Sequence, residues 1–170
     1  NNSDIVTSVS QSLKENTLRS FVVKNEIEVI PNFVDLSLYQ KDIPCQRSQI
    51  APNGEKIISH ISNMRTVKRI PDVIDVFYKI QNKEDAILLM IGDGPEREKA
   101  EQQAKNLGIY SKVKFLGKTI EIKKLLSMSD LFLLTSATES FGLVALEAMA
   151  AKVPVISSNA GGISEVNVHG

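Results

Sequence analysis

Short apolar runs alternate with segments of helical periodicity along this chain. Runs of strand length and strand composition occupy residues 27–32, 57–62, 86–92, 113–117, 130–136 and 153–158. Apolar residues at helical spacing predict helices over residues 72–82, 95–107, 120–128, 140–152 and at the end of 160–166. The run 86–92 is almost entirely apolar, which is typical of a parallel strand covered on both faces.

This alternation predicts an α/β fold built from repeated strand–helix–strand units. Such units form a Rossmann-like, doubly wound parallel sheet with right-handed crossovers. In these sheets, ligands bind beyond the carboxyl ends of the strands. The candidate binding loops are therefore SNMRTVK, GDGPE, LGK, TSATESFG and NAGG.

Length, charge and cysteine content limit the classes of protein to which this chain can belong. The chain has 170 residues, which suits one principal domain, and its 20 basic and 20 acidic residues cancel. A general nucleic-acid binder would carry a basic excess, so we expect no nucleic-acid partner. A single cysteine, Cys45, excludes an internal disulfide framework and fits a reducing cytoplasm. No apolar run approaches the roughly 20 residues that span a membrane.

The segment ESFGLVALEAMA (139–150) carries two glutamates eight positions apart. Ser140 is a good N-cap, so we expect a helix to begin near Phe141, with Glu139 just ahead of it and Glu147 two turns inside. A solvated glutamate at the edge of a buried stripe is one interpretation of Glu147. The other is a ligand site, because the amides of a helix N-terminus favour phosphate and Gly142 permits close approach.

Each of the remaining polar loops can be interpreted either as a structural feature or as part of a ligand site. SNMRTVKR (62–69) is either a solvated basic loop or a phosphate-binding loop, and GDGPE favours a tight turn. Residues 38–56 are polar and predict a loop or linker, and His60 lies within a strand pattern and is expected to be structural. The chain contains no zinc-ligand spacing, Walker loop or Ser-His-Asp arrangement that would support another chemistry.

These motifs together resemble a known family. The E-x7-E pair follows, in order and spacing, IPNFVD (30–35), SNMRTVKR, IGDGPE (91–96) and VKFLG (113–117), and precedes NAGG and SEV. The set is similar to the retaining glycosyltransferases with the GT-B fold, and it covers nearly the whole chain. The resemblance implies that residues 27–170 are the C-terminal, nucleotide-sugar-binding half of that fold. Residues 1–26 would be the end of its N-terminal domain.

The resemblance also implies roles for individual residues. Glu139 would contact donor-sugar hydroxyls, Glu147 would hold the ribose, and backbone amides would hold the distal phosphate at Phe141, Gly142 and Leu143. Lys68 matches the family's phosphate-loop lysine. Asn63 stands where the family has an arginine, so Arg65 is a candidate substitute. The nucleobase contacts would come from Leu116, Gly117 and Lys118.

Within the family, NMRTVKRIPDVI, ESFGLVALEAMA and NAGGISEV resemble the bacterial branch that begins bacillithiol synthesis. That branch implies transfer of N-acetylglucosamine from UDP-N-acetylglucosamine to L-malate in the cytoplasm, with no metal and no cofactor beyond the donor. The chain lacks an initiator Met, and we expect it to be a piece of a longer protein. The acceptor pocket would lie mostly in an N-terminal GT-B domain outside this chain, so the fragment alone should not transfer sugar. We keep a homo-oligomer of the full-length protein as an expectation.

Three other functions remain open at this point. A related hexosyltransferase with a sugar, lipid or protein acceptor would carry the same motifs. A GT-B sugar-nucleotide epimerase would bind the same donor, although E-x7-E followed by FGLV disfavours it. A regulatory module such as a flavodoxin-like receiver would need an acidic cluster at the first strand, which the sequence lacks.

Overall fold

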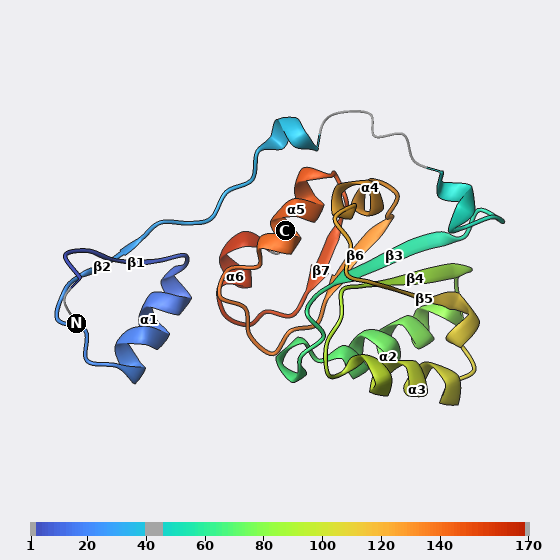
Figure 1. Ribbon diagram of the computed structural model, residues 1–170, viewed down its shortest axis with the longest axis horizontal. Coiled ribbons are helices and arrows are strands. Elements are labelled where there is room, and N and C mark those ends of the chain that lie inside the picture. The colour runs from blue at the N-terminus through green and yellow to red at the C-terminus, as the bar shows by residue number, and fades with distance from the viewer. Residues whose placement is uncertain (1–2, 40–45, 169–170) are drawn as a thin grey trace.

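The computed structural model describes residues 3–39 and 46–168, so the prediction for Cys45 lies outside the described residues. The chain forms a small N-terminal unit and a larger α/β unit (Figure 1). In the small unit, β1 (Val6–Ser8) and β2 (Ile27–Val29) pair in parallel and are connected by α1 (Gln11–Ser20). The predicted domain boundary after residue 26 falls between these two strands and stays a prediction.

The larger unit alternates strands and helices, as predicted. Its elements are β3 (Lys56–Ile61), α2 (Ile70–Gln81), β4 (Ala86–Ile91), α3 (Arg97–Asn106), β5 (Val113–Gly117), α4 (Ile122–Ser127), β6 (Leu131–Leu134), α5 (Leu143–Ala150), β7 (Val155–Ser157) and α6 (Ile163–Val166). Short 3-10 turns lie at η1 (Leu36–Leu38), η2 (Arg47–Gln49), η3 (Thr66–Lys68) and η4 (Tyr110–Lys112).

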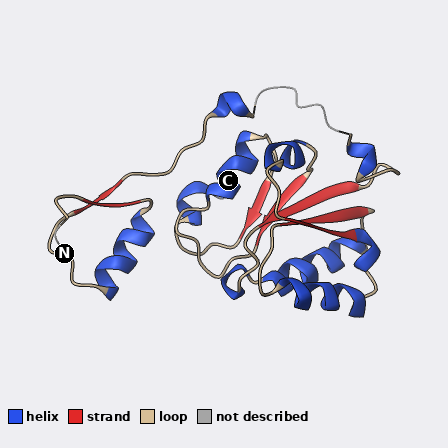
Figure 2. Cartoon of the chain, in the orientation of Figure 1, coloured by secondary structure: helices blue, strands red, loops and turns tan. Residues whose placement is uncertain are grey.

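The five strands β3 to β7 form one parallel sheet in the order β5-β4-β3-β6-β7 (Figure 2). The chain first builds outward from β3 to β5 and then crosses back to add β6 and β7 on the other side of β3. The doubly wound parallel sheet is therefore confirmed. Its strand order reverses between β3 and β6, and a crevice at such a switch point is where ligands bind in open α/β sheets.

Helices cover both faces of this sheet, α2 and α3 on one and α4, α5 and α6 on the other. Every residue of β4 is buried, as its apolar run predicted. Alternate side chains point to opposite layers: Leu89 packs in the cluster that includes α4 and α5, and Leu88 packs in the cluster that includes α2 and α3. The core thus holds the strand ends, and the loops that follow them, in a defined arrangement.

The helix predicted over residues 140–152 begins later than expected. It starts at Leu143, and Gly142 occupies the N-cap position with a φ of +94°. This left-handed conformation favours glycine, and a Cβ on Gly142 would also lie 2.4 Å from Ile163 Cδ1. The prediction that Ser140 caps this helix is wrong, because the chain needs the left-handed turn at Gly142 before it can enter α5.

Part of the predicted linker over residues 38–56 is anchored to the α/β unit through Arg47. The guanidinium of Arg47 donates to the carbonyls of Met128 and Glu55 and pairs with the carboxylate of Asp130. Asp130 also accepts the Ile57 amide at 2.7 Å, which ties this segment to the starts of β3 and β6. Among the described residues, no helix is long and apolar enough to cross a membrane.

Candidate functional site

An ion pair occupies the switch point of the sheet. Lys68 lies in η3 after β3, and Glu139 lies in the loop after β6. The Lys68 Nζ is 2.6 Å from Glu139 Oε1, and the two side chains are only 20% and 12% exposed. The structure therefore brings together two residues that the sequence predicted to act on the same donor.

The two loops that carry this pair are tied to each other. Thr135 Oγ1 donates to the Lys68 carbonyl at 3.0 Å, and the Ala137 amide donates to the Val67 carbonyl at 2.8 Å. Both bonds join the loop after β6 to the turn after β3. The ammonium and carboxylate groups are thus held by backbone contacts as well as by their own attraction.

Ser136 completes the surroundings of Glu139. Its hydroxyl donates to Glu139 Oε1 at 2.6 Å, and the residue is fully buried. The same carboxylate oxygen therefore accepts from both Ser136 and Lys68, which orients the carboxylate and offsets its charge. Sequence reasoning missed Ser136; its position three residues before Glu139 in TSATE is the only signal available.

A glycine pair supports Glu139 from the other side. The Glu139 amide donates to the Ala160 carbonyl, and the Glu139 carbonyl accepts from the Gly162 amide at 2.7 Å. A Cβ on Gly161 would lie 2.4 Å from the Glu139 carbonyl oxygen, and Gly161 has a φ of +75°. The NAGG loop is therefore packed directly against the backbone of the candidate site.

The predicted phosphate-binding amides lie at the start of α5. In the part of the chain that the structure describes, no hydrogen bond uses the backbone N–H of Phe141, Gly142 or Leu143. Phe141 is buried, whereas Leu143 is 40% exposed. Free amides at a helix N-terminus are favourable partners for an anion, so this geometry suits the predicted role.

Glu147 is neither freely solvated nor packed among the core residues of α5. It is half-buried, and burial raises the pKa of its carboxyl, against the lowering effects of a hydrogen bond with Tyr39 and the charge of Lys123. Burial and Glu147 also raise the pKa of Tyr39, and Lys123 Nζ lies 5.4 Å from the Tyr39 ring centroid. The sequence did not predict Tyr39 or Lys123, because both reach Glu147 from other elements.

The two other candidate residues of the phosphate loop, Asn63 and Arg65, are placed differently from Lys68. Asn63 and Arg65 are exposed, and among the described residues neither side chain bonds to Lys68 or Glu139. Met64 between them is fully buried with a φ of 40°, which turns the chain sharply. The structure thus brings Lys68 to Glu139 but does not bring Asn63 or Arg65 into contact with that pair.

His60 supports the start of the phosphate loop (62–69) through Ser62. Its Nδ1 lies 2.9 Å from the Leu133 carbonyl, which can only accept, so Nδ1 carries the proton. Its Nε2 then accepts from the Ser62 hydroxyl at 2.8 Å, and Ser62 Oγ accepts from the Met64 amide. Burial lowers the pKa of His60 to about 4, so the ring is neutral and structural, as predicted.

The predicted nucleobase contacts lie at the end of β5, on the same edge of the sheet. Gly117 has a φ of +70°, and its carbonyl accepts from the Gly92 amide at 2.8 Å. Leu116 and Lys118 are exposed beside it. Arg97 Nη1 would lie 3.6 Å from a Cβ on Gly117, so a guanidinium that the sequence did not predict borders this position.

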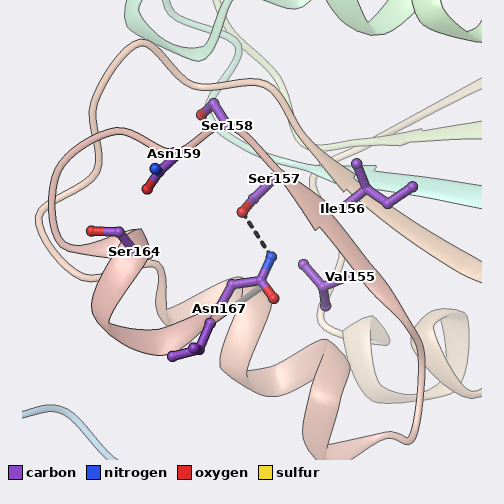
Figure 3. Close-up of a pocket in the computed structure, with 8 residues that line it drawn as sticks. Val155, Ile156, Ser157, Ser158, Asn159, Ser164 and Asn167 are labelled. Carbon is purple, nitrogen blue, oxygen red and sulfur yellow. Dashed lines mark hydrogen bonds between the residues drawn. The ribbon is translucent and has the colours of Figure 1, made fainter. Parts of the chain in front are cut away.

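Several hollows lie near these loops, and two of them differ clearly in the charge of their lining. A cavity of about 330 Å³ is lined by Leu13, Asn16, Val67, Lys68, Thr138, Glu139 and Ser140, and it contains the ion pair. A larger hollow of about 890 Å³ follows the exposed edge of β7 (Figure 3), where Asn167 donates to Ser157. None of the residues lining the larger hollow is charged, so the smaller one is the better candidate for phosphate chemistry. No group of His, Cys, Asp and Glu suited to hold a metal occurs among the described residues.

Comparison with known proteins agrees with this geometry. The family model of glycosyl transferases group 1 matches residues 43–170. The chain is 47% identical, over 99% of its length, to N-acetyl-alpha-D-glucosaminyl L-malate synthase of Bacillus anthracis, of which it covers 45%. It is 35% identical, over 96% of its length, to an uncharacterized glycosyltransferase of Methanocaldococcus jannaschii, of which it covers 44%. The chain thus spans about half the length of the curated relatives it matches.

A solved structure shows the same architecture. Anabaena HepE in complex with UDP and glucose superposes with a TM-score of 0.89 at 30% identity. The match covers 99% of this chain and 48% of that one. The five-stranded parallel sheet and its helices therefore match one half of a GT-B glycosyltransferase.

Proposed function

The chain belongs to the glycosyl transferases group 1 family, and we propose that the intact protein transfers N-acetylglucosamine from UDP-N-acetylglucosamine to L-malate. This would be the first step of bacillithiol biosynthesis in a bacterial cytoplasm. The observation that carries the proposal is the 47% identity to the L-malate synthase, because it extends over 99% of the chain. The ion pair at the switch point of the sheet supports the reaction class.

In this proposal, the donor lies along α5. Its distal phosphate binds the amides at Phe141–Leu143, its ribose binds Glu147, and its base lies near Leu116–Lys118. The Lys68 ammonium, and Arg65 to a smaller extent, stabilise the negative charge that develops on the departing diphosphate. Binding of a phosphate beside Lys68 would compete with the Lys68–Glu139 contact, and would release Glu139 to accept hydrogen bonds from sugar hydroxyls.

Glu139 acts by positioning the sugar and not as a covalent nucleophile. A retaining glycosidase places its nucleophilic carboxylate directly beneath the reacting carbon. Here the carboxylate is already held by Ser136 and Lys68, and both bonds reduce its nucleophilicity. The acceptor then attacks the same face from which the diphosphate leaves, guided by that leaving group, and the configuration is retained. No step requires a metal.

A product assay on the intact protein tests this proposal. The protein is incubated with UDP-N-acetylglucosamine, with and without L-malate, while UDP release and product mass are followed. Malate-dependent UDP release with a glucosaminyl-malate product is the expected result. UDP release without malate would indicate hydrolysis or the epimerase alternative. Turnover only with a sugar or lipid acceptor would show that malate is not the acceptor, but the protein would still be a glycosyltransferase.

A second assay addresses the fragment itself. Residues 1–170 are expected to bind UDP or a UDP-sugar only weakly and not to transfer sugar, because the acceptor pocket is proposed to lie mostly in an N-terminal GT-B domain outside residues 1–170. Turnover of UDP-N-acetylglucosamine with malate by the fragment alone would contradict the proposed division into domains.

A further inference from the structure

The start of α1 is bonded to the loops of the candidate site. Among the described residues, three hydrogen bonds join the N-terminal unit to the α/β unit. The Ser10 hydroxyl donates to the Ser140 carbonyl at 2.5 Å, and the amides of Gln11 and Ser12 donate to the Glu165 carboxylate at 2.9 and 2.8 Å. Figure 1 shows the first turn of α1 directed toward α6, which carries Glu165.

Glu165 serves as a helix cap provided by a different part of the chain. The first amides of a helix have no intrahelical acceptor and carry a partial positive charge. Ser10 Oγ accepts the Leu13 amide at 3.1 Å, which leaves the amides of Gln11 and Ser12 for Glu165. Each of its two oxygens takes one amide, and such charge-assisted bonds are stronger than neutral ones. The contact therefore fixes both the position and the direction of α1.

The Ser10 contact is closely packed. Ser10 is 1% exposed, and a Cβ on Gly162 would lie 2.8 Å from its hydroxyl and 2.2 Å from the Ser140 carbonyl. The Gly162 amide in turn bonds the Glu139 carbonyl. α1 is thus seated on the same backbone that carries the candidate sugar-binding glutamate.

This seating determines which side chains border the ion pair. The cavity around Lys68 and Glu139 is completed by Leu13 and Asn16, in the first and second turns of α1. If α1 rotated or withdrew, the cavity would lose that wall. The placement of α1 is therefore part of the geometry of the site, although its capping residue Glu165 does not line the cavity.

We propose that Glu165 is a positioning residue for the transfer reaction: by capping α1 it holds the N-terminal unit in the orientation that closes the cavity over Lys68 and Glu139. This inference rests on the proposed function, because a transferase must bring an acceptor-binding part against its donor site. The proposed contacts to the UDP part of the donor all lie in the α/β unit. Loss of the cap therefore lowers the rate of transfer and leaves UDP affinity unchanged.

Two kinds of variant of the intact protein separate this role from a loss of folding. Gln11→Pro removes one donated amide but suits the first position of a helix, and the extended backbone of Ser10 is compatible with a following proline. Gln11→Ala keeps the amide and is its matched control. Glu165→Gln removes the charge and one acceptor while keeping the size of the side chain.

We expect Gln11→Pro and Glu165→Gln to lower kcat by roughly tenfold, the scale on which losing one helix cap shifts an equilibrium. Gln11→Ala should retain the parental kcat, and all three variants should bind UDP with the parental Kd by calorimetry. Unchanged kcat in both test variants would overturn the proposal. A rise in the UDP Kd equal to the fall in kcat would overturn it too, because Glu165 would then act through the donor.

A distance measurement tests the role of Glu165 without any need to know the acceptor. Nitroxide labels on Ser20→Cys in α1 and Glu98→Cys in α3, in a background in which Cys45 and any other native cysteine are replaced by Ser, report the orientation of the two units with UDP bound. The parent and Gln11→Ala should give a narrow distance distribution, and Gln11→Pro and Glu165→Gln a broader or longer one. Identical distributions would overturn the proposal, whereas failure of the malate assay would leave this result intact.

Discussion

Lys68 Nζ and Glu139 Oε1 lie 2.6 Å apart although the two residues are 71 positions apart in the sequence. Each residue follows one of the two strands that flank the switch point of the sheet. The pair therefore exists because the chain crosses back over β3 to place β6 beside it. It joins the candidate phosphate-binding cation to the candidate sugar-binding carboxylate.

Replacing Lys68 should affect catalysis more than any other basic substitution in this loop. Lys68→Met removes a charge that would stabilise the leaving diphosphate, and we expect kcat of the intact protein to fall by about 10² to 10³. The exposed Arg65 is not held against Glu139, so Arg65→Met should cost less than about tenfold. Steady-state kinetics with saturating donor measures both. Equal losses in the two variants would contradict the assignment of Lys68 as the main cation.

Glu147 should combine a functional role with a cost in stability. Burial raises the pKa of its carboxyl, so the folded protein disfavours the ionised form relative to the unfolded chain. That cost is present above the folded-state pKa and disappears when the carboxyl is protonated. Glu147→Gln should therefore raise Tm at pH 7 and leave it unchanged near pH 4, as measured by thermal unfolding without ligand.

The same substitution should weaken donor binding. A ribose hydroxyl bonded to an ionised carboxylate contributes about 1.5 to 3 kcal/mol, so the UDP Kd should rise by roughly ten- to a hundredfold in Glu147→Gln. Tyr39→Phe is the matched control, because it removes a hydrogen bond to Glu147 but keeps the carboxylate. A UDP Kd that changes in Tyr39→Phe but not in Glu147→Gln would argue against ribose binding at Glu147.

His60 should make the protein sensitive to acid. Its native pKa of about 4 lies below the usual value of 6.5, chiefly because the ring is buried. As the pH falls from 6.5 toward 4, the unfolded chain binds a proton there while the folded protein does not. The free energy of unfolding should fall by about 3 kcal/mol over that interval from this group. Urea unfolding at several pH values measures the slope.

The contribution of His60 can be isolated by comparison with His60→Gln. The variant loses the hydrogen-bonded ring and is less stable at pH 7, but its stability should decline less steeply between pH 6.5 and 4. Parallel pH profiles for the two proteins would show that other groups cause the acid sensitivity.

Gly94 should tolerate no side chain, although its backbone conformation is ordinary. A Cβ there would lie 1.9 Å from the Asn63 carbonyl oxygen and 2.9 Å from that of Met64. Because both atoms belong to the backbone of the phosphate loop, Gly94→Ala should displace that loop, lower stability by about 3 kcal/mol and weaken UDP binding. Denaturant unfolding and calorimetry measure the two effects.

Gly108 provides the comparison. It has a φ of +72° but no atom within 4 Å of a Cβ position, so Gly108→Ala should cost only about 1 kcal/mol and leave UDP affinity unchanged. If Gly94→Ala proved milder than Gly108→Ala, the close approach of GDGPE to the phosphate loop would have no energetic importance.

Much of the fold follows from local patterns in the sequence. The fully buried β4 corresponds to a run of apolar residues, and α2 corresponds to apolar residues at helical spacing. The start of α5 was mispredicted because Ser140 is a favourable cap in isolation. The structure instead has a left-handed turn at Gly142, which packs against Ile163 of α6, 21 residues later.

The sequence by itself determined which residue types stand after each strand, and hence the loops that can bind a nucleotide sugar. It placed Glu139 just ahead of a helix and Glu147 inside it, because helical periodicity is a local property. Only the tertiary structure decided which loops meet. Strand order brings Lys68 to Glu139, packing brings Tyr39 to Glu147, and α6 brings Glu165 to the start of α1. These contacts arise between segments distant in sequence, and the free energy that selects them is that of the assembled core.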